Sequence, residues 1–423
     1  MKRIFAILIS FIALTVAAEA QNAFVGDWSG ELNVMGTKLK MVFHISTDND
    51  ATSLKATLDV PEQSAKGIPS TITTSADSLT INVPMIGAKY AAKLVGNELL
   101  GKFFQNGLSL PLNLAKGEEK LQRPQNPQPP FPYTTKDVTF VNAKAGATLA
   151  GTLTYPIGYD SKKAATTPVA IMVTGSGQQN RDEELFEHRP FAVIADYLAR
   201  NGIATLRYDD RGVGESKGGL TPDVTSRDFA DDALAGIEYL RNLGEFGKVG
   251  IIGHSEGGMI AFMLGAENKV DFIVSLAGPG AKGSDVIMSQ VRRQIENSPM
   301  AATIPDIDAA TKQNYEIVLK QMQSAWLTFF LNYDPVPDIR ACRCPVLAMN
   351  GSLDSQVISS LNLPLIKANL SENPQNEVVE FEGLNHLFQH CTTGAATEYY
   401  NIEETFATEA LDAIAKFITK INK

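Results

Sequence analysis

Cysteine and histidine are scarce in this sequence. Three cysteines among 423 residues cannot build a disulfide framework, and the five histidines show no spacing typical of metal ligands. Cys342 and Cys344 precede an expected strand over residues 345–350, whereas Cys391 falls beyond the other end of the sheet. Because the three thiols are not expected to converge, the sequence predicts no metal site, and small buried side chains are the expected role of the cysteines.

Positive charge is also in short supply. The chain has 37 lysine and arginine residues against 47 aspartate and glutamate residues, which gives a formal net charge of −10. No basic cluster occurs beyond the first residues of the chain. This balance argues against nucleic acid or an anionic membrane surface as a partner.

Long apolar runs are absent except at the N-terminus. There, Lys2 and Arg3 precede an apolar stretch over residues 4–16, and Ala18-Glu19-Ala20 offers small residues for cleavage. The stretch is too short to span a bilayer stably. We therefore expect residues 1–20 to be a signal peptide cleaved after Ala20, and the mature protein to be secreted or periplasmic, with no stable membrane insertion after cleavage.

Residues 21–118 read as a small all-β domain. Short alternating segments separated by turn residues predict about eight strands in a barrel or a sandwich. His44 and Trp28 are expected in its core or at its rim, because nothing around them indicates a ligand site. The clearest alternating segments are residues 26–32, 39–45, 78–83 and 90–94.

A proline-rich stretch over residues 123–132 follows this region. Such a composition is typical of a semi-rigid connector, so we expect a linker over residues 119–134. Apolar strands then alternate with amphipathic helices over residues 135–423, which predicts a mostly parallel sheet with helices on both faces. Helical patterns alone fill about residues 281–336, and we expect them to form a cap over the sheet.

The segment Gly253-His254-Ser255-Glu256-Gly257 lies between an apolar strand and a helical pattern. This context favours a nucleophile elbow, in which a tight turn raises the Ser255 hydroxyl above the sheet. The turn would also direct the Glu256 main-chain amide at a developing oxyanion. His254 is expected to point elsewhere and to pack.

A serine nucleophile requires a base, and the base requires an acid that orients it. Asp354 follows one expected strand and His386 follows the next, so both fall where a parallel sheet places its active site. Asp354 could instead cap a helix, and His386 could be a surface histidine. His390 is the rival base.

The glycine-rich segment Thr174-Gly175-Ser176-Gly177 follows the strand over residues 168–173. We expect the Ser176 amide to be the second oxyanion donor, with Gly175 as the alternative. Gly175 also joins three residues expected in a substrate pocket, which are Met288, Trp326 and Phe330. The segment from Asp209 to Ser216 lacks the spacing of a nucleotide-binding loop, and we interpret it as structural, with Arg211 paired to an aspartate.

Together these motifs resemble the α/β-hydrolase superfamily over about residues 137–423. The chain is most similar to bacterial secreted carboxylesterases and serine-aminopeptidase-like hydrolases, which often carry an N-terminal β domain. Many relatives begin the oxyanion loop with His-Gly, whereas here Thr174 precedes Gly175, which leaves the subfamily open. The resemblance is carried by residues 174–177 (TGSG), 210–216 (DRGVGES), 253–258 (GHSEGG) and 351–354 (GSLD).

The sequence therefore predicts a cofactor-free serine hydrolase of the α/β-hydrolase fold. The favoured activity is that of a carboxylesterase that acts on small or short-acyl esters. One alternative is an aminopeptidase, in which Glu183 or Glu184 would hold the substrate amino group. The other is a lipid- or glycan-binding protein with an inactive hydrolase domain. Neither the physiological substrate nor the oligomeric state follows from the residues.

Overall fold

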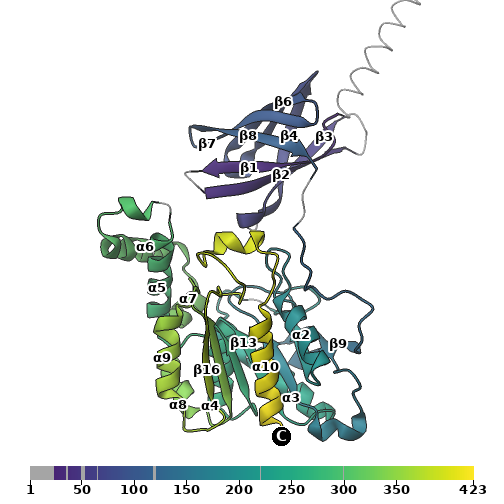
Figure 1. Cartoon of the computed structure of the whole chain (residues 1–423), viewed down its shortest axis with the longest axis vertical. Coiled ribbons are helices and arrows are strands. Elements are labelled where there is room, and N and C mark those ends of the chain that lie inside the picture. Colours follow the sequence, from purple (N-terminus) through teal and green to yellow (C-terminus); the bar gives the residue numbers. More distant parts are fainter. Residues whose placement is uncertain are drawn as a thin grey trace, which may run out of the picture. The chain divides into compact units, whose positions relative to one another are not determined.

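The computed structural model describes residues 23–34, 37–48, 53–63, 65–117, 121–219, 221–298 and 300–423 (Figure 1). The expected signal peptide, residues 1–20, lies outside the described residues. The chain divides into two compact units, residues 1–122 and 123–423. Within the part of the chain that is described, no helix has both the length and the apolar character needed to cross a membrane.

The first unit is a closed barrel of eight strands in sequence order. All neighbours are antiparallel, and β1 closes the barrel by pairing Ser29 with Ala115 of β8. The barrel interior is filled with side chains: Phe43 and Tyr90 stack at 5.3 Å between ring centroids, and the buried Trp28 indole donates to the Phe24 carbonyl. The strands are β1 (Gly26–Val34), β2 (Thr37–Thr47), β3 (Leu54–Val60), β4 (Ala65–Ser75), β5 (Ser78–Val83), β6 (Ala88–Val95), β7 (Glu98–Gln105) and β8 (Leu108–Lys116).

The second unit is built on one eight-stranded sheet in the order β16-β15-β14-β13-β11-β12-β10-β9. The six strands from β16 to β12 are mutually parallel, and the hairpin β9–β10 adds antiparallel strands at one edge. The strands are β9 (Thr135–Asn142), β10 (Ala147–Thr154), β11 (Val169–Val173), β12 (Ala204–Tyr208), β13 (Val249–His254), β14 (Ile273–Leu276), β15 (Val346–Gly351) and β16 (Glu377–Phe381).

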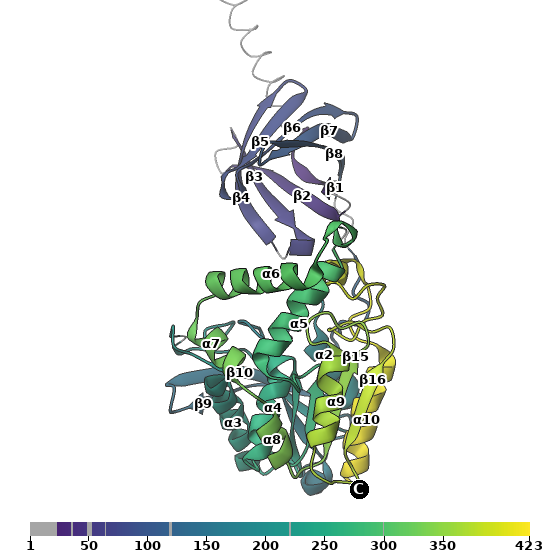
Figure 2. The ribbon, with the colours of Figure 1, turned by 90° about the vertical axis from the view of Figure 1, so that its left-hand side faces the viewer.

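Helices cover both faces of this sheet. In β11, Val169, Ile171 and Val173 enter one apolar cluster, whereas Ala170 and Met172 enter the other. Alternate side chains thus face opposite layers, which explains why the whole strand is apolar. Helices α2 (Pro190–Arg200) and α10 (Thr408–Ile421) cover one face (Figure 1). Helices α3 (Ser226–Leu243), α4 (Glu256–Ala266), α8 (Val336–Ala341) and α9 (Ser359–Asn369) cover the other (Figure 2).

The helical insertion lies between β14 and β15, over the segment where the sequence predicts it. It contains α5 (Gly283–Glu296), α6 (Ile307–Gln321) and α7 (Ala325–Asn332). Local capping sets two of the helix starts: Asp306 accepts from the Ala309 amide, and Ser324 accepts from the Leu327 amide. Helix α8, which follows, belongs to the sheet layer, because Ile339 is buried in the core.

The proline-rich stretch differs from the expected linker. Arg123 donates to the carbonyls of Phe186, Tyr400 and Ile402, so the stretch is fastened to the second unit at its first residue. Gln125 pairs with the main chain of Phe406 in both directions, donating at 2.7 Å and accepting at 3.0 Å. The expected linker over residues 119–134 is therefore too long at its C-terminal side, because composition reports the prolines but not the polar anchors between them.

Candidate active site

The turn between β13 and α4 is strained at Ser255. Its φ of +52° and ψ of −116° are unusual for a residue with a side chain. Neighbouring glycines allow this turn: a Cβ on Gly253 would lie 2.0 Å from the Gly257 carbonyl oxygen, and a Cβ on Gly257 would lie 2.1 Å from that of Val173. The half-buried Ser255 side chain consequently stands at the head of a helix, as in a nucleophile elbow.

An acid–base pair lies beside this turn. Asp354 follows β15, and its Oδ2 lies 2.7 Å from Nδ1 of His386, which follows β16. Asp354 Oδ1 accepts from the main-chain amides of Gln356 and Val357 at 2.7 and 2.9 Å. Both partners are buried, with side-chain exposures of 4 % for His386 and 0 % for Asp354. The carboxylate is thus fixed in the position that orients a histidine base.

Ser255 and His386 line the same cavity. Their side chains make no hydrogen bond in this structure, and such catalytic contacts commonly tighten only when substrate is bound. The rival base is elsewhere: His390 is 57 % exposed and lies between Glu404 and Glu409, at 2.8 and 3.1 Å. The structure therefore brings His386, and not His390, to the serine.

The segment after β11 supplies amides near Ser255. A Cβ on Gly175 would lie 3.2 Å from the Ser255 Cβ, so the two main chains are in close contact. The Gly175 amide donates to Glu183 Oε1 at 2.7 Å and is already used. The Ser176 amide has no acceptor among the described residues. The Glu256 amide lies in the first turn of α4, where helix amides lack an internal acceptor. The two amides that the sequence predicts as oxyanion donors therefore make no other hydrogen bond among the described residues.

Removal of the Ser176 amide tests this geometry. We expect Ser176→Pro to lower hydrolytic turnover by about 10²–10³, because it removes the amide that the sequence predicts as an oxyanion donor. Ser176→Ala is the matched control, since it keeps the amide and removes only the hydroxyl; kcat should stay within about threefold. Steady-state kinetics would measure both, and equal losses in the two variants would contradict the assignment.

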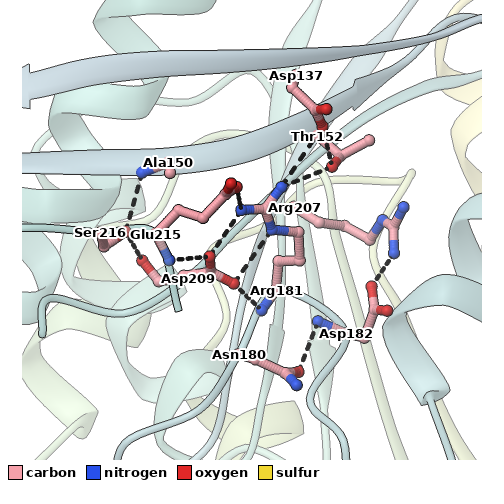
Figure 3. A network of polar contacts seen from close by, with 10 residues as sticks. All are labelled: Asp137, Ala150, Thr152, Asn180, Arg181, Asp182, Arg207, Asp209, Glu215 and Ser216. Atoms are coloured by element: carbon pink, nitrogen blue, oxygen red, sulfur yellow. Dashed lines mark hydrogen bonds and ion pairs between the residues drawn. The ribbon is translucent and has the colours of Figure 1, made fainter. Parts of the chain in front are cut away.

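The segment from Thr174 to Gly177, called the oxyanion segment after its predicted role, runs into a loop that a network of ion pairs holds (Figure 3). Arg181 binds Asp209 through Nε at 3.1 Å and Nη2 at 2.7 Å, and the Arg181 amide donates to the same carboxylate. Asp182 pairs with Arg207 of β12. The segment is therefore fastened to the strand ends of the sheet, which keeps its amides in place.

Asp210, the residue after Asp209, adds a second support to the loop that follows β11. Asp210 accepts from the Gln179 amide and from the Thr174 hydroxyl, at 2.9 and 3.2 Å. Burial raises the pKa of Asp210 to about 7, although these hydrogen bonds oppose the rise. The predicted pairing of Arg211 is confirmed: its guanidinium meets the buried Asp232 carboxylate at 2.7 and 2.8 Å. The segment from Asp209 to Ser216 thus serves as scaffold.

The cavity in front of Ser255 has a volume of about 450 Å³. Trp326 and Phe330 of α7 form part of its wall, stacked at 5.6 Å between centroids, and Gly175 also lines it. The Trp326 indole donates to Glu256 Oε1 at 2.8 Å. Burial raises the pKa of the Glu256 carboxyl, an effect that hydrogen bonds, including the one from Trp326, partly offset.

Met288 does not line this cavity, contrary to the expectation from sequence. The residues of α5 that do are Val286, Ile287, Gln290, Val291 and Gln294. These positions recur at the spacing of one helical face, and Met288 lies about 130° around the helix from the middle of that face. Apolar composition indicated that the helix lined a pocket but could not fix its rotation.

Two residues of the site were not predicted in their observed roles. His254 lines the cavity rather than only packing. Glu183 Oε1 lies 2.9 Å from Nδ1 of His254. Two adjacent acids, Glu183 and Glu184, were the only signal in the sequence. Glu184 is exposed and pairs with Arg189, so only the fold tells which acid turns inward.

Comparison with known proteins gives a consistent picture. The family model described as serine aminopeptidase, S33, matches residues 187–325. Esterase EstD of Thermotoga maritima is 25 % identical over 301 residues, which cover 69 % of this chain and 69 % of the relative.

Solved structures similar to this chain include an esterase of Pyrococcus furiosus, with 18 % identity, 72 % of this chain and 98 % of that chain covered, and a TM-score of 0.48. Another is Est1E of Butyrivibrio proteoclasticus with ferulic acid bound, with 19 % identity, 68 % and 100 % covered, and a TM-score of 0.44. The family model, which matches about a third of the chain, and the curated relative make this chain similar to serine hydrolases that include an esterase, and its mostly parallel sheet fits that similarity.

Proposed function

We propose that this protein is a carboxylesterase that works through a Ser255–His386–Asp354 triad and an acyl-enzyme. One observation carries the proposal: a serine on a strained elbow shares a cavity with a histidine that an aspartate holds at 2.7 Å. The similarity to Esterase EstD supports ester bonds as the target.

The N-terminal segment, residues 1–20, supports a secreted or periplasmic location, which sequencing the N-terminus of the exported protein would test.

In the proposed reaction, Ser255 Oγ attacks the ester carbonyl while Nε2 of His386 takes its proton. Asp354 holds Nδ1 and stabilises the imidazolium that forms. The amides of Ser176 and Glu256 donate to the oxyanion of the tetrahedral intermediate. His386 then gives its proton to the departing alcohol, and a water activated by the same histidine releases the acid from Ser255.

The cavity favours an uncharged substrate. Among the described residues that line it there is no lysine or arginine, and the only carboxylate, Glu183, already binds the Gly175 amide and His254. Apolar side chains dominate one side, and four glutamines supply neutral hydrogen-bonding groups: Gln179, Gln290, Gln294 and Gln356. An ester with an apolar or aromatic group and neutral polar substituents fits this lining. The aminopeptidase alternative needs an acid free to hold an ammonium group.

Labelling with a fluorophosphonate, followed by competition with a panel of substrates, tests the proposal. We expect the probe to attach to Ser255 and neutral esters to protect it, whereas aminoacyl amides should not. Protection by aminoacyl amides alone would favour the aminopeptidase. No labelling of the folded protein would favour a non-catalytic role.

The aromatic wall provides a prediction on specificity. We expect Trp326→Ala to lower kcat/KM for a phenyl-substituted ester by about tenfold, mainly through KM, because the buried contact with the indole is lost. Ethyl acetate, which has no aromatic group to contact the indole, should change by less than about threefold. Met288→Ala is the control, since Met288 lies in the same insertion but outside the cavity. An equal loss for both esters would contradict a role in specificity.

A further inference from the structure

A second histidine–carboxylate pair lies next to the proposed triad. His254 Nδ1 is 2.9 Å from Glu183 Oε1, and both side chains are buried, with exposures of 8 % and 6 %. On its other side, His254 Nε2 donates to the main-chain carbonyl of His386 at 3.0 Å. The proposed reaction uses neither Glu183 nor the His254 ring, so the pair requires its own explanation.

Glu183 reaches inward from a bent main chain. Its φ is +51°, a conformation that costs free energy in a residue with a side chain. The same Oε1 that faces His254 also accepts from the Gly175 amide at 2.7 Å. One carboxylate oxygen thus connects the oxyanion segment to the residue that precedes the nucleophile.

His254 completes the connection toward the base. Its ring packs on that of His386, with centroids 4.7 Å apart and planes at 48°. The end of β13 and the segments that follow β11 and β16 therefore meet at Glu183 and His254. We propose that these two residues form an ion pair that positions both the oxyanion segment and His386, and that loss of the His254 proton limits activity at alkaline pH. This inference rests on the proposed esterase function.

Hydrogen bonding and charge support the ion pair. A carbonyl only accepts, so His254 Nε2 carries a proton, and a charged ring can donate from Nδ1 to the Glu183 carboxylate as well. Burial opposes protonation, but Glu183, the His386 carbonyl and Asp354 outweigh it and raise the pKa of His254. The Glu183 charge also compensates the positive ring, which would otherwise repel the proton that His386 gains in the reaction.

The direction of the pH effect follows from this shift. Below its raised pKa, His254 is charged and donates to both partners. As the pH rises through that pKa, one proton is lost, and the ring can no longer donate to both Glu183 and the His386 carbonyl. We therefore expect kcat/KM to fall at alkaline pH. Glu183→Gln removes the charge that opposes burial, so the fall should begin at lower pH.

The test uses the full-length protein and measures kcat and KM for phenyl acetate between about pH 5 and 10. Glu183→Gln should move the alkaline fall down by about one pH unit or more, and should lower kcat more than it raises KM. His254→Gln should abolish the fall, because the titrating ring is gone. Glu184→Gln, at the exposed neighbour, is the matched control and should leave the profile unchanged.

An alkaline fall at the same pH in wild type, Glu183→Gln and His254→Gln would overturn the inference. If a variant does not fold, ¹⁵N NMR of the wild-type histidine rings decides instead, with His254 identified through single variants of the other histidines. A His254 ring that titrates at or below the ordinary value of about 6.5 would also overturn it. A wild-type protein that hydrolyses no ester and takes no fluorophosphonate would refute the proposed function, while the NMR titration would still decide the ion pair.

Discussion

Ester hydrolysis should fall by about 10³ or more in Ser255→Ala, with the fold intact. The nucleophilic oxygen is removed, whereas the oxyanion amides and the cavity stay, so substrate binding should persist. Steady-state kinetics with phenyl acetate would measure the loss, and circular dichroism would verify the fold. Turnover within tenfold of the wild type would remove Ser255 from the mechanism.

The strained turn adds a second readout to the same experiment. Glycine tolerates positive φ without the cost that a side chain brings. Ser255→Gly should therefore be as inactive as Ser255→Ala but more stable than it, by about 1–3 kcal/mol of unfolding free energy if most of the strain is released. Chemical denaturation of the two variants would compare them. A lower stability for Ser255→Gly would show that the φ of +52° is not a source of strain.

The second large effect concerns the base. His386→Ala should lower kcat/KM by about 10³ or more, and Asp354→Asn should do so by a similar factor because it offers His386 the wrong hydrogen-bonding partner. His390→Ala is the matched control and should retain full activity, since His390 is exposed and lies between two glutamates.

The pH profile gives an independent check on the base. A histidine base accepts a proton only in its neutral form, so kcat/KM of the wild type should rise as the pH is raised from acidic values. The small residual activity of His386→Ala should lack this rise. A profile that rises in His386→Ala as in the wild type, or that changes in His390→Ala, would reassign the base.

The sequence could predict where the three residues of the proposed triad lie, because each follows a strand of the parallel sheet. Ser255, Asp354 and His386 each follow a strand, and a parallel sheet brings such positions to one edge. The position of each residue just after an apolar strand can therefore be recognised from the sequence around it. The contact between Asp354 and His386 spans 32 residues yet follows from the topology alone.

Other features depend on contacts that no local pattern records. The alternation that predicted strands over residues 21–118 fits a barrel and a sandwich equally, and the closure of the barrel depends on long-range pairing such as that of Ser29 with Ala115. Glu183 and His254 are likewise 71 residues apart, and neither belongs to a motif that would join them. The rotation of α5, which excludes Met288 from the cavity, is set by packing against its neighbours.

The anchored proline-rich stretch bears on how the two modules could be separated or recombined. The proline-rich composition suggests truncating the chain near Tyr133. That truncation would remove Gln125, which pairs with the main chain of Thr405 and Phe406. The amide of the following Ala407 donates to the Phe388 carbonyl at 2.7 Å, two residues beyond His386. A graft joined at Tyr133 would lose the Gln125 contacts and would thereby weaken the packing behind the loop that carries His386, although none of the proposed triad residues is changed. In a chimaera, residues 123–132 should therefore stay with the second unit, which they anchor at its N-terminal end.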